Sequence, residues 1–494
     1  KQWGVAKRAQ GAQLTAELDA LFNAPPNELA DRIENLSSFG RQAVSEATIW
    51  SRSYDKSTRL RALLFLNSVE PRQFGEIIPL LGMTPPEFIG PVLKIASQAD
   101  DAIDELTAAA TKAKDPVVAL RASILLAHLS DDVLLRNHLK GSLDGAADYD
   151  LIMQAIDWKH DPRLWAKIVS NRRADTRVRY FATLILGAYP QDQLRRAELS
   201  LDFDDLVNHP DSTVHAAGRY LAECVGNDCF DIPLNPGDDA NWILGPGEIP
   251  MIRFEPEKYE YEPVTPATAK SKHPNIVVDI DRPFWMSSIP VSQKLYARFD
   301  ASDAVVPEDS DARVTVEDVV IRQDILEDKN QPMLATTLAE ACTMCNWLSR
   351  QEGLEECYEY QPPPAVLSEG SRVSLRKVPW SLDREANGYR LPLTSEFEAA
   401  ALGMHRKGTF WRIAEQICRS SGYEGKFDYS SPLFSLVPSP TGVFCFDQHR
   451  GAWISTDGWA SSISARQSGF GKGLHLIPRA SPGVVMFLAR TAEE

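Results

Sequence analysis

The sequence of 494 residues has no long apolar run and few cysteines. No uninterrupted apolar stretch approaches the roughly 20 residues that a membrane-spanning helix requires, so we expect no membrane span within this chain. Seven cysteines, an odd number at low density, fit a reducing compartment better than a disulfide framework, and they indicate the cytoplasm. The chain begins at Lys1 with neither an initiator methionine nor a signal peptide, so we expect further sequence upstream.

Positive charge is also scarce. Lys and Arg number 52 against 68 Asp and Glu, which gives a net charge of −16. Because affinity for nucleic acids depends largely on clustered cations, this balance argues against a nucleic-acid partner. A content of 44% hydrophobic and 24% charged residues is typical of a globular protein. The length exceeds that of one ordinary core and predicts two or three domains.

Residues 1–230 have a helical pattern, within which a segment led by aspartate recurs. An Asp stands before each Arg-containing, Ala/Leu-rich stretch, at the evenly spaced positions Asp55, Asp115 and Asp175, and more weakly at Asp211. Asp can cap a helix, Pro116 suits a first helical turn, and each apolar face would bury itself against a neighbouring helix. Such repetition predicts stacked helical pairs in a HEAT-like array. An irregular helical bundle is the alternative.

Residues 231–272 are rich in Pro, Gly, Asp and Glu, and they predict a connector between two domains. Trp242 could anchor this connector to a surface. Its acidic and aromatic run at 255–262 is most simply solvated, although it could dock on a basic patch of a partner. Residues 273–494 then alternate short strands, helices and long turns, which predicts an α+β domain.

Four sequence blocks stand out in this last region. They are RPFWMSSIPVSQKLYARF at 282–299, LATTLAEACTMCNWLSRQEGLEECYEY at 334–360, GYRLPLTSEFEAAALG at 388–403 and SPTGVFCFDQHRGAWISTDGW at 439–459. In this order they resemble the formylglycine-generating enzyme, or sulfatase-modifying factor, family. The resemblance implies a C-type-lectin-like core with little regular secondary structure. In the third block, Arg390 could tie loop carbonyls or a carboxylate, and Thr394 or Ser395 could cap the following helix.

The resemblance also implies a test for catalysis. Family members that oxidise a substrate cysteine bind copper through two cysteine thiolates near the end of the domain. The corresponding stretch at 468–490 contains no cysteine, and His475 and Met486 are its only conceivable metal ligands. A lone His with a Met is far more often part of a core than of a metal site. We therefore expect no catalytic residue, no cofactor and no metal.

The fourth block has lost polar groups as well. Gly451, Ile454 and Ser455 stand where the family has Asn, Glu and Trp, so a calcium or substrate site built on those side chains would lack ligands. Asp447 and His449 could form an acid–base pair, but without a third partner a surface hydrogen-bond cluster is the simpler interpretation.

Two cysteine pairs have zinc-like or disulfide-like spacing. Cys342 and Cys345 lie in a predicted helix without a second Cys/His pair, which favours a place in the core over a zinc site. Cys224 and Cys229 could pair in an oxidising setting, but two ordinary thiols at a helix end are the simpler interpretation.

The four family blocks are kept, whereas the copper-binding cysteines and the polar side chains of the fourth block are missing. This combination predicts a non-catalytic protein-interaction or regulatory protein with a protein partner, in a bacterial signalling or defence pathway. The aromatic and Arg content of the C-terminal part suits a recognition face. Its expected residues are His449, Arg450, Trp453, Trp459, Arg466, Phe470 and Arg479. Two alternatives stay open: a divergent metal-dependent oxidase or modifying enzyme of the same family, and the regulatory region or a released fragment of a larger kinase-type protein.

Overall fold

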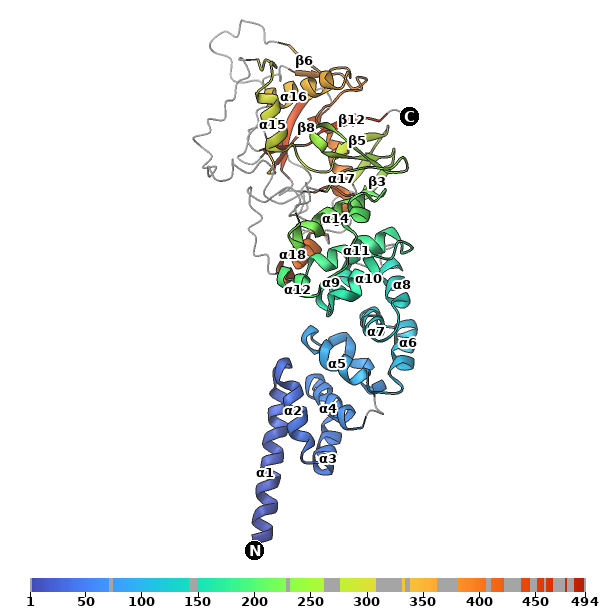
Figure 1. Cartoon of the computed structure of the whole chain (residues 1–494), viewed down its shortest axis with the longest axis vertical. Helices are drawn as coiled ribbons and strands as arrows, with labels where there is room; N and C mark the ends of the chain where they lie inside the picture. Colours follow the sequence, from blue (N-terminus) through green and yellow to red (C-terminus); the bar gives the residue numbers. More distant parts are fainter. Residues whose placement is uncertain are drawn as a thin grey trace, which may run out of the picture. The chain divides into compact units, whose positions relative to one another are not determined.

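The computed structural model divides the chain into two compact units, Lys1–Ile185 and Leu186–Glu494. Figure 1 shows the helices and strands in their order along the chain. The residues that the structure describes are 2–70, 74–141, 149–227, 232–261, 276–307, 331–333, 338–361, 380–405, 410–421, 437–444, 451–456, 459–464, 476–477 and 484–492. Among them, no helix combines the length and the apolar content that crossing a membrane requires. The division falls at Ile185, whereas the sequence predicted a helical domain to residue 230 followed by a connector.

The first unit is helical throughout its described part. Its α-helices are α1 (Gln2–Asn23), α2 (Leu29–Ser37), α3 (Arg41–Trp50), α4 (Lys56–Val69), α5 (Ile89–Ala96), α6 (Ala102–Lys112), α7 (Pro116–Leu129), α8 (Val133–Gly141), α9 (Tyr149–Asp157), α10 (Pro162–Val169) and α11 (Thr176–Gly187), which ends in the second unit. Short 3-10 turns are η1 (Pro26–Glu28), η2 (Phe74–Glu76), η3 (Ile78–Met83) and η4 (Pro86–Phe88).

These helices recur at a constant interval along the sequence. Helices α4, α7 and α11 begin at residues 56, 116 and 176, and α2, α5 and α9 begin at residues 29, 89 and 149, so that successive starts in both sets are 60 residues apart. Helices α3, α6 and α10 begin at residues 41, 102 and 162 and keep nearly the same spacing. Among the described residues, three helices therefore recur in each period, with α8 as an additional helix in the period that begins at α5, whereas the sequence predicted pairs. Two helices of average length with short connections fill only about 30 to 40 residues, which is well short of the interval and leaves room for the third.

The expected aspartate caps are present. Three of these side chains accept a hydrogen bond from a backbone N–H in the first turn of the following helix: Asp55 from Thr58 at 2.8 Å, Asp115 from Val117 at 2.9 Å and Asp175 from Arg177 at 3.0 Å. Asp211 caps α14 in the second unit in the same way. Pro116 occupies the first position of α7, as predicted.

Removing one of these caps gives a measurable loss. We expect Asp115→Ala to lower the free energy of unfolding of the first unit by about 1 kcal/mol, because one N–H of the first turn of α7 loses its acceptor. Asp101→Ala is the matched control, since Asp101 precedes α6 without making a side-chain cap bond. Urea titrations followed by circular dichroism measure both changes. Equal losses in the two variants would contradict the role assigned to the cap.

A contact between an arginine side chain and a backbone carbonyl also recurs within the first unit. Arg61 donates to the carbonyl oxygen of Ala24 at 3.1 Å, and Arg121 donates to that of Thr84 at 2.8 Å. Both contacts join residues 37 positions apart, and each acceptor precedes a Pro-Pro pair. Burial lowers the pKa of Arg121 to about 10, although the negative charges of Asp157 and Asp115 act in the opposite direction and raise it. The recurrence thus extends from helix positions to side-chain contacts.

A partly buried histidine, His128, is expected to make the stability of the first unit sensitive to acid. His128 on α7 lies against His160, with ring centroids 5.6 Å apart, and burial, with a smaller contribution from His160, lowers the pKa of His128 to about 4. The unfolded chain takes up this proton near pH 6.5 and the folded unit only near pH 4, so stability should fall as the pH drops from about 6.5 to 4. We expect His128→Gln to flatten this decline. An identical decline in wild type and variant, measured by urea titration at several pH values, would contradict the assignment.

The second unit combines helices with short strands. Its α-helices are α12 (Gln191–Arg196), α13 (Phe203–Val207), α14 (Ser212–Val225), α15 (Gln293–Asp300), α16 (Leu338–Gln351), α17 (Thr394–His405) and α18 (Phe410–Ser421), and η5 (Pro246–Glu248) is a 3-10 turn. Its strands are β1 (Trp242–Leu244), β2 (Pro250–Phe254), β3 (Lys258–Tyr261), β4 (Ile276–Asp279), β5 (Phe284–Ser287), β6 (Tyr358–Tyr360), β7 (Trp380–Leu382), β8 (Gly451–Thr456), β9 (Trp459–Ser464), β10 (Leu476–Ile477), β11 (Val484–Met486) and β12 (Ala489–Thr491).

Two four-stranded sheets organise this unit. The first has the order β1-β2-β5-β12, with every pair antiparallel. The second has the order β10-β9-β8-β11, with β11 parallel to β8. β3 pairs with β4 and β6 with β7. Because β1 (Trp242–Leu244) and β12 (Ala489–Thr491) belong to the same sheet, the first sheet joins segments that are far apart in the sequence.

The segment predicted as a connector contains strands of the first sheet. β2 lies between β1 and β5, and both Trp242 and Met251 are completely buried. Trp242 is therefore anchored, as its sequence context indicated. Pro and Gly are abundant here because strands of three to five residues alternate with tight turns, such as the turn at η5 where Gly247 has φ +65°.

Candidate functional site

The third sequence block builds a buried charged site in the second unit. Arg390 adds to the edge of the first sheet, since its N–H donates to the carbonyl oxygen of Ala489 at 2.8 Å and its own oxygen accepts from the N–H of Ala489 at 2.7 Å. Pro392 follows, and α17 begins two residues later at Thr394. The chain thus turns sharply from a sheet edge into a helix, which brings Arg390 and the first turn of α17 together.

Arg390 and Glu396 form a bidentate ion pair. The two guanidinium nitrogens Nη1 and Nη2 donate to the two carboxylate oxygens of Glu396, each at 2.6 Å, and the side chains are only 3% and 4% exposed. Burial by itself would lower the pKa of Arg390, but the carboxylate of Glu396 outweighs it and raises the pKa above the ordinary value. The pair is therefore charged on both sides and electrically neutral as a unit.

Glu396 also stabilises the start of helix α17. Its Oε2 accepts the N–H of Leu393 at 2.7 Å, which satisfies one of the free N–H groups at the start of α17. The sequence had offered Thr394 or Ser395 for capping; the structure shows the carboxylate three residues beyond the cap position taking a backbone N–H. With these three hydrogen bonds, the Glu396 carboxylate joins the Arg390 guanidinium to the start of α17.

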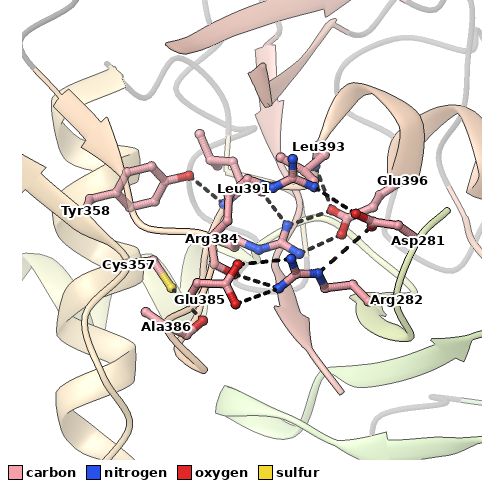
Figure 2. A network of polar contacts seen from close by, with 11 residues as sticks. Asp281, Arg282, Cys357, Tyr358, Arg384, Glu385, Ala386, Leu391, Leu393 and Glu396 are labelled. Atoms are coloured by element: carbon pink, nitrogen blue, oxygen red, sulfur yellow. Dashed lines mark hydrogen bonds and ion pairs between the residues drawn. The ribbon is translucent and has the colours of Figure 1, made fainter. Parts of the chain in front are cut away.

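Figure 2 shows a second charged cluster beside this pair, defined here as the rim: Asp281, Arg282, Arg384 and Glu385. Arg282 Nη2 lies 3.0 Å from Glu385 Oε1, and Arg282 Nη1 donates to the carbonyl oxygen of Arg384 at 3.2 Å. The hydrogen bond to Glu385 raises the pKa of Arg282. Because the Glu385 side chain is 79% exposed, water screens this pair and it adds little stability.

The thiols near this cluster are buried. Cys342 and Cys345 on α16 are inaccessible, and Cys357 has its Sγ 3.8 Å from the carbonyl oxygen of Ala386 (Figure 2). Burial raises the pKa of Cys357 to about 11 and the pKa values of Cys342 and Cys345 well above normal. Protonated thiols are poor nucleophiles and poor metal ligands. The core position predicted for Cys342 and Cys345 is confirmed.

The described residues contain no group of three or more His, Cys, Asp or Glu side chains that could hold a metal ion. Met486 is fully buried on β11, which is the position of a core side chain. Cys224 is a free thiol whose pKa burial raises to about 12, while Cys229 and His475 lie outside the described part of the chain.

The structure describes the predicted recognition face only in part. Trp453 lies on β8, where it pairs with Ser462, and Trp459 lies on β9, where it pairs with Thr456. Gly451, Ile454 and Ser455 lie on β8 as well. The other members lie outside the described residues, together with Asp447: His449, Arg450, Arg466, Phe470 and Arg479. Their grouping stays a prediction.

Sequence reasoning missed the partners of Arg390. It named a carboxylate only as one possibility, although the spacing of six residues to Glu396 could have indicated it. It also missed Tyr358, whose hydroxyl oxygen accepts the N–H of Leu391 at 2.9 Å. No local signal links Tyr358 to a loop 33 residues away, because that contact depends on the tertiary fold.

Comparison with known proteins places this site in a family domain. Residues 246–445 match the model of the Sulfatase-modifying factor enzyme 1-like domain. This range includes β2, the rim, α16 and the Arg390–Glu396 pair, and it ends before the stretch at 468–490. No curated protein and no solved structure matches the chain.

Proposed function

We propose that this chain, which contains a Sulfatase-modifying factor enzyme 1-like domain at residues 246–445, is a non-catalytic protein that binds a protein partner and has a regulatory role. One observation supports this above the rest. The Arg390–Glu396 pair of the domain is complete, whereas residues 468–490, where the family's copper-binding cysteines are expected, contain no cysteine. The framework is kept and the soft metal ligands are gone.

The finer architecture belongs to the same proposal. We assign a C-type-lectin-like fold to residues 273–494, on the resemblance of the four sequence blocks. We assign a HEAT-like array to residues 1–230, supported by the regular recurrence of helices, aspartate caps and arginine contacts. Residues 231–272 connect them in sequence. Cys224, Cys342, Cys345 and Cys357 form no disulfide, which supports a reducing compartment such as the cytoplasm.

The recognition face is proposed on the second sheet and the segments that follow it. Trp453 and Trp459 occupy adjacent strands of that sheet, and Arg466, Phe470 and Arg479 follow in sequence. Trp and Arg dominate the binding energy of protein interfaces because they bury large areas and form several hydrogen bonds. The low content of positive charge supports a protein rather than a nucleic acid as the partner.

Partner capture by the full chain tests this face. The tagged chain is isolated from its native cells, and the amount of each protein recovered with it is measured by quantitative mass spectrometry. We expect the double variant Trp459→Ala with Arg466→Ala to recover at least about tenfold less of the specific partner than the wild type does. Trp50→Ala is the matched control, because Trp50 is a half-exposed tryptophan of the first unit. Retention of every partner by the double variant, or equal loss in the control, would refute the face.

A further inference from the structure

Helix α14 lies outside the family-matched range, yet it is bound firmly to the first sheet. The ring of Trp242 on β1 stacks on that of His215 of α14, with centroids 3.9 Å apart and planes at 27°. Its Nε1 donates to the carbonyl oxygen of His209 at 2.8 Å. Both Trp242 and His215 are completely buried. A tryptophan of the sheet thus occupies the core beneath the start of the helix.

Asn241 adds a polar bridge at the same place. Its Oδ1 accepts the N–H of Ser212 at 2.7 Å, and its own N–H donates to the carbonyl oxygen of Pro210 at 3.0 Å. Its carbonyl oxygen accepts the N–H of Arg253 on β2 at 2.9 Å. One residue therefore satisfies backbone groups of both the helix start and a strand of the matched domain.

A third segment, residues 437–444, lies much later in the sequence and packs against both α14 and β2. Gly442, at φ +85°, lies so close that an added Cβ would be 2.8 Å from the carbonyl oxygen of Ser212 and 3.1 Å from Ile252 Cδ1. Only glycine suits both this backbone conformation and this space. The segment 437–444 thus contacts the start of α14 and the strand β2 together.

The opposite end of α14 contacts other helical segments of the second unit. Gly187 lies against the ring of Tyr220, and Gly226, which ends α14 at φ +85°, lies beside Arg195 of α12, whose Nη2 would be 2.5 Å from an added Cβ. A helix with both ends in close contact moves as one body, because protein interiors are too densely filled to absorb a local displacement.

We propose that α14 is a shared helix that couples the sulfatase-modifying-factor-type domain to the helical segment before it, so that residues 186–245 and the matched domain form one cooperative unit. Binding at the domain would then change the stability of α12 as well as that of the sheet. This inference rests on the contacts of α14 and not on the proposed function. It makes the domain larger than its family match.

Hydrogen exchange on the full chain tests the coupling. We expect Trp242→Ala to speed exchange of the amides of α14, of α12 and of residues 437–444 together, by at least about 100-fold. Phe65→Ala is the control, since Phe65 is a completely buried aromatic side chain on α4 of the first unit, outside the proposed cooperative unit. It should change exchange in α14 and α12 by less than about threefold.

Asn241→Ala provides a milder variant if Trp242→Ala does not fold. Because it removes the acceptor of the Ser212 N–H, we expect about tenfold faster exchange in the same three segments. Unchanged exchange in α12, with faster exchange confined to the start of α14, would overturn the coupling. Equal effects of Phe65→Ala and Trp242→Ala on exchange in α14 and α12 would overturn it as well.

Discussion

Gly388→Ala is expected to destabilise the second unit by about 3 kcal/mol or more. A Cβ atom at this position would overlap the carbonyl oxygen of Glu355 and lie 2.5 Å from Ser349 Oγ. That hydroxyl also accepts the N–H of Tyr389 at 2.8 Å, so the loop cannot retreat without breaking a buried hydrogen bond. The substitution therefore forces apart α16 and the loop that leads to Arg390.

Denaturant titration, with hydrogen exchange in α16 to identify the unit that unfolds, measures this loss. Gly237→Ala is the control, because only the flexible side chain of Asp239 lies near its added Cβ. We expect a change within about 0.5 kcal/mol for the control. A Gly388→Ala protein as stable as the control would show that the close approach of these two segments is not required.

Breaking the Arg390–Glu396 pair is expected to cost a similar amount. Arg390→Met leaves a buried carboxylate without its cation, and Glu396→Gln leaves a buried guanidinium without its anion, so each should lose about 3 to 5 kcal/mol. The double variant should lose less than the sum of the two, because it leaves neither charge unpaired. The exposed pair formed by Arg282 and Glu385 is the matched control.

The exposed Arg282–Glu385 pair shows how much stability is lost when the same charges are removed without burial. Arg282→Met and Glu385→Gln remove the same two charge types at side chains that are 32% and 79% exposed, and each should cost less than about 1 kcal/mol. Additive losses at Arg390 and Glu396, or losses no larger than those of the rim pair, would contradict the account of a buried ion pair. Urea titration of the four single variants and the Arg390/Glu396 double variant decides this.

Local chemistry made part of this structure predictable from sequence. The aspartate caps follow from one side chain and the next helical turn, so Asp55 and Asp115 could be assigned without a fold. The core position of Cys342 and Cys345 follows from helical spacing and the lack of further ligands. The family domain was recognisable because its blocks keep their order along the chain.

Contacts between distant segments were not predictable in the same way. Helix α14 contacts Trp242 and Gly442 within the second unit, and no periodicity in the sequence reports such contacts. Strands of three to five residues between Pro and Gly turns also have the composition of a connector, which concealed β1 and β2. The third helix of each period escaped notice because the sequence pattern marked only one helix per period, the one that begins after the recognisable aspartate.

Copper binding tests the central claim of a retained framework without redox chemistry. The measurement is a competition for Cu(I) between the 494-residue chain and a chromophoric chelator, with oxygen uptake recorded in the presence of a cysteine-containing peptide and a reductant. We predict that the chelator keeps the copper and that oxygen uptake equals that of the peptide alone, because residues 468–490 supply no thiolate. Withdrawal of one equivalent of copper per chain, with oxygen uptake abolished by His475→Ala, would contradict the account.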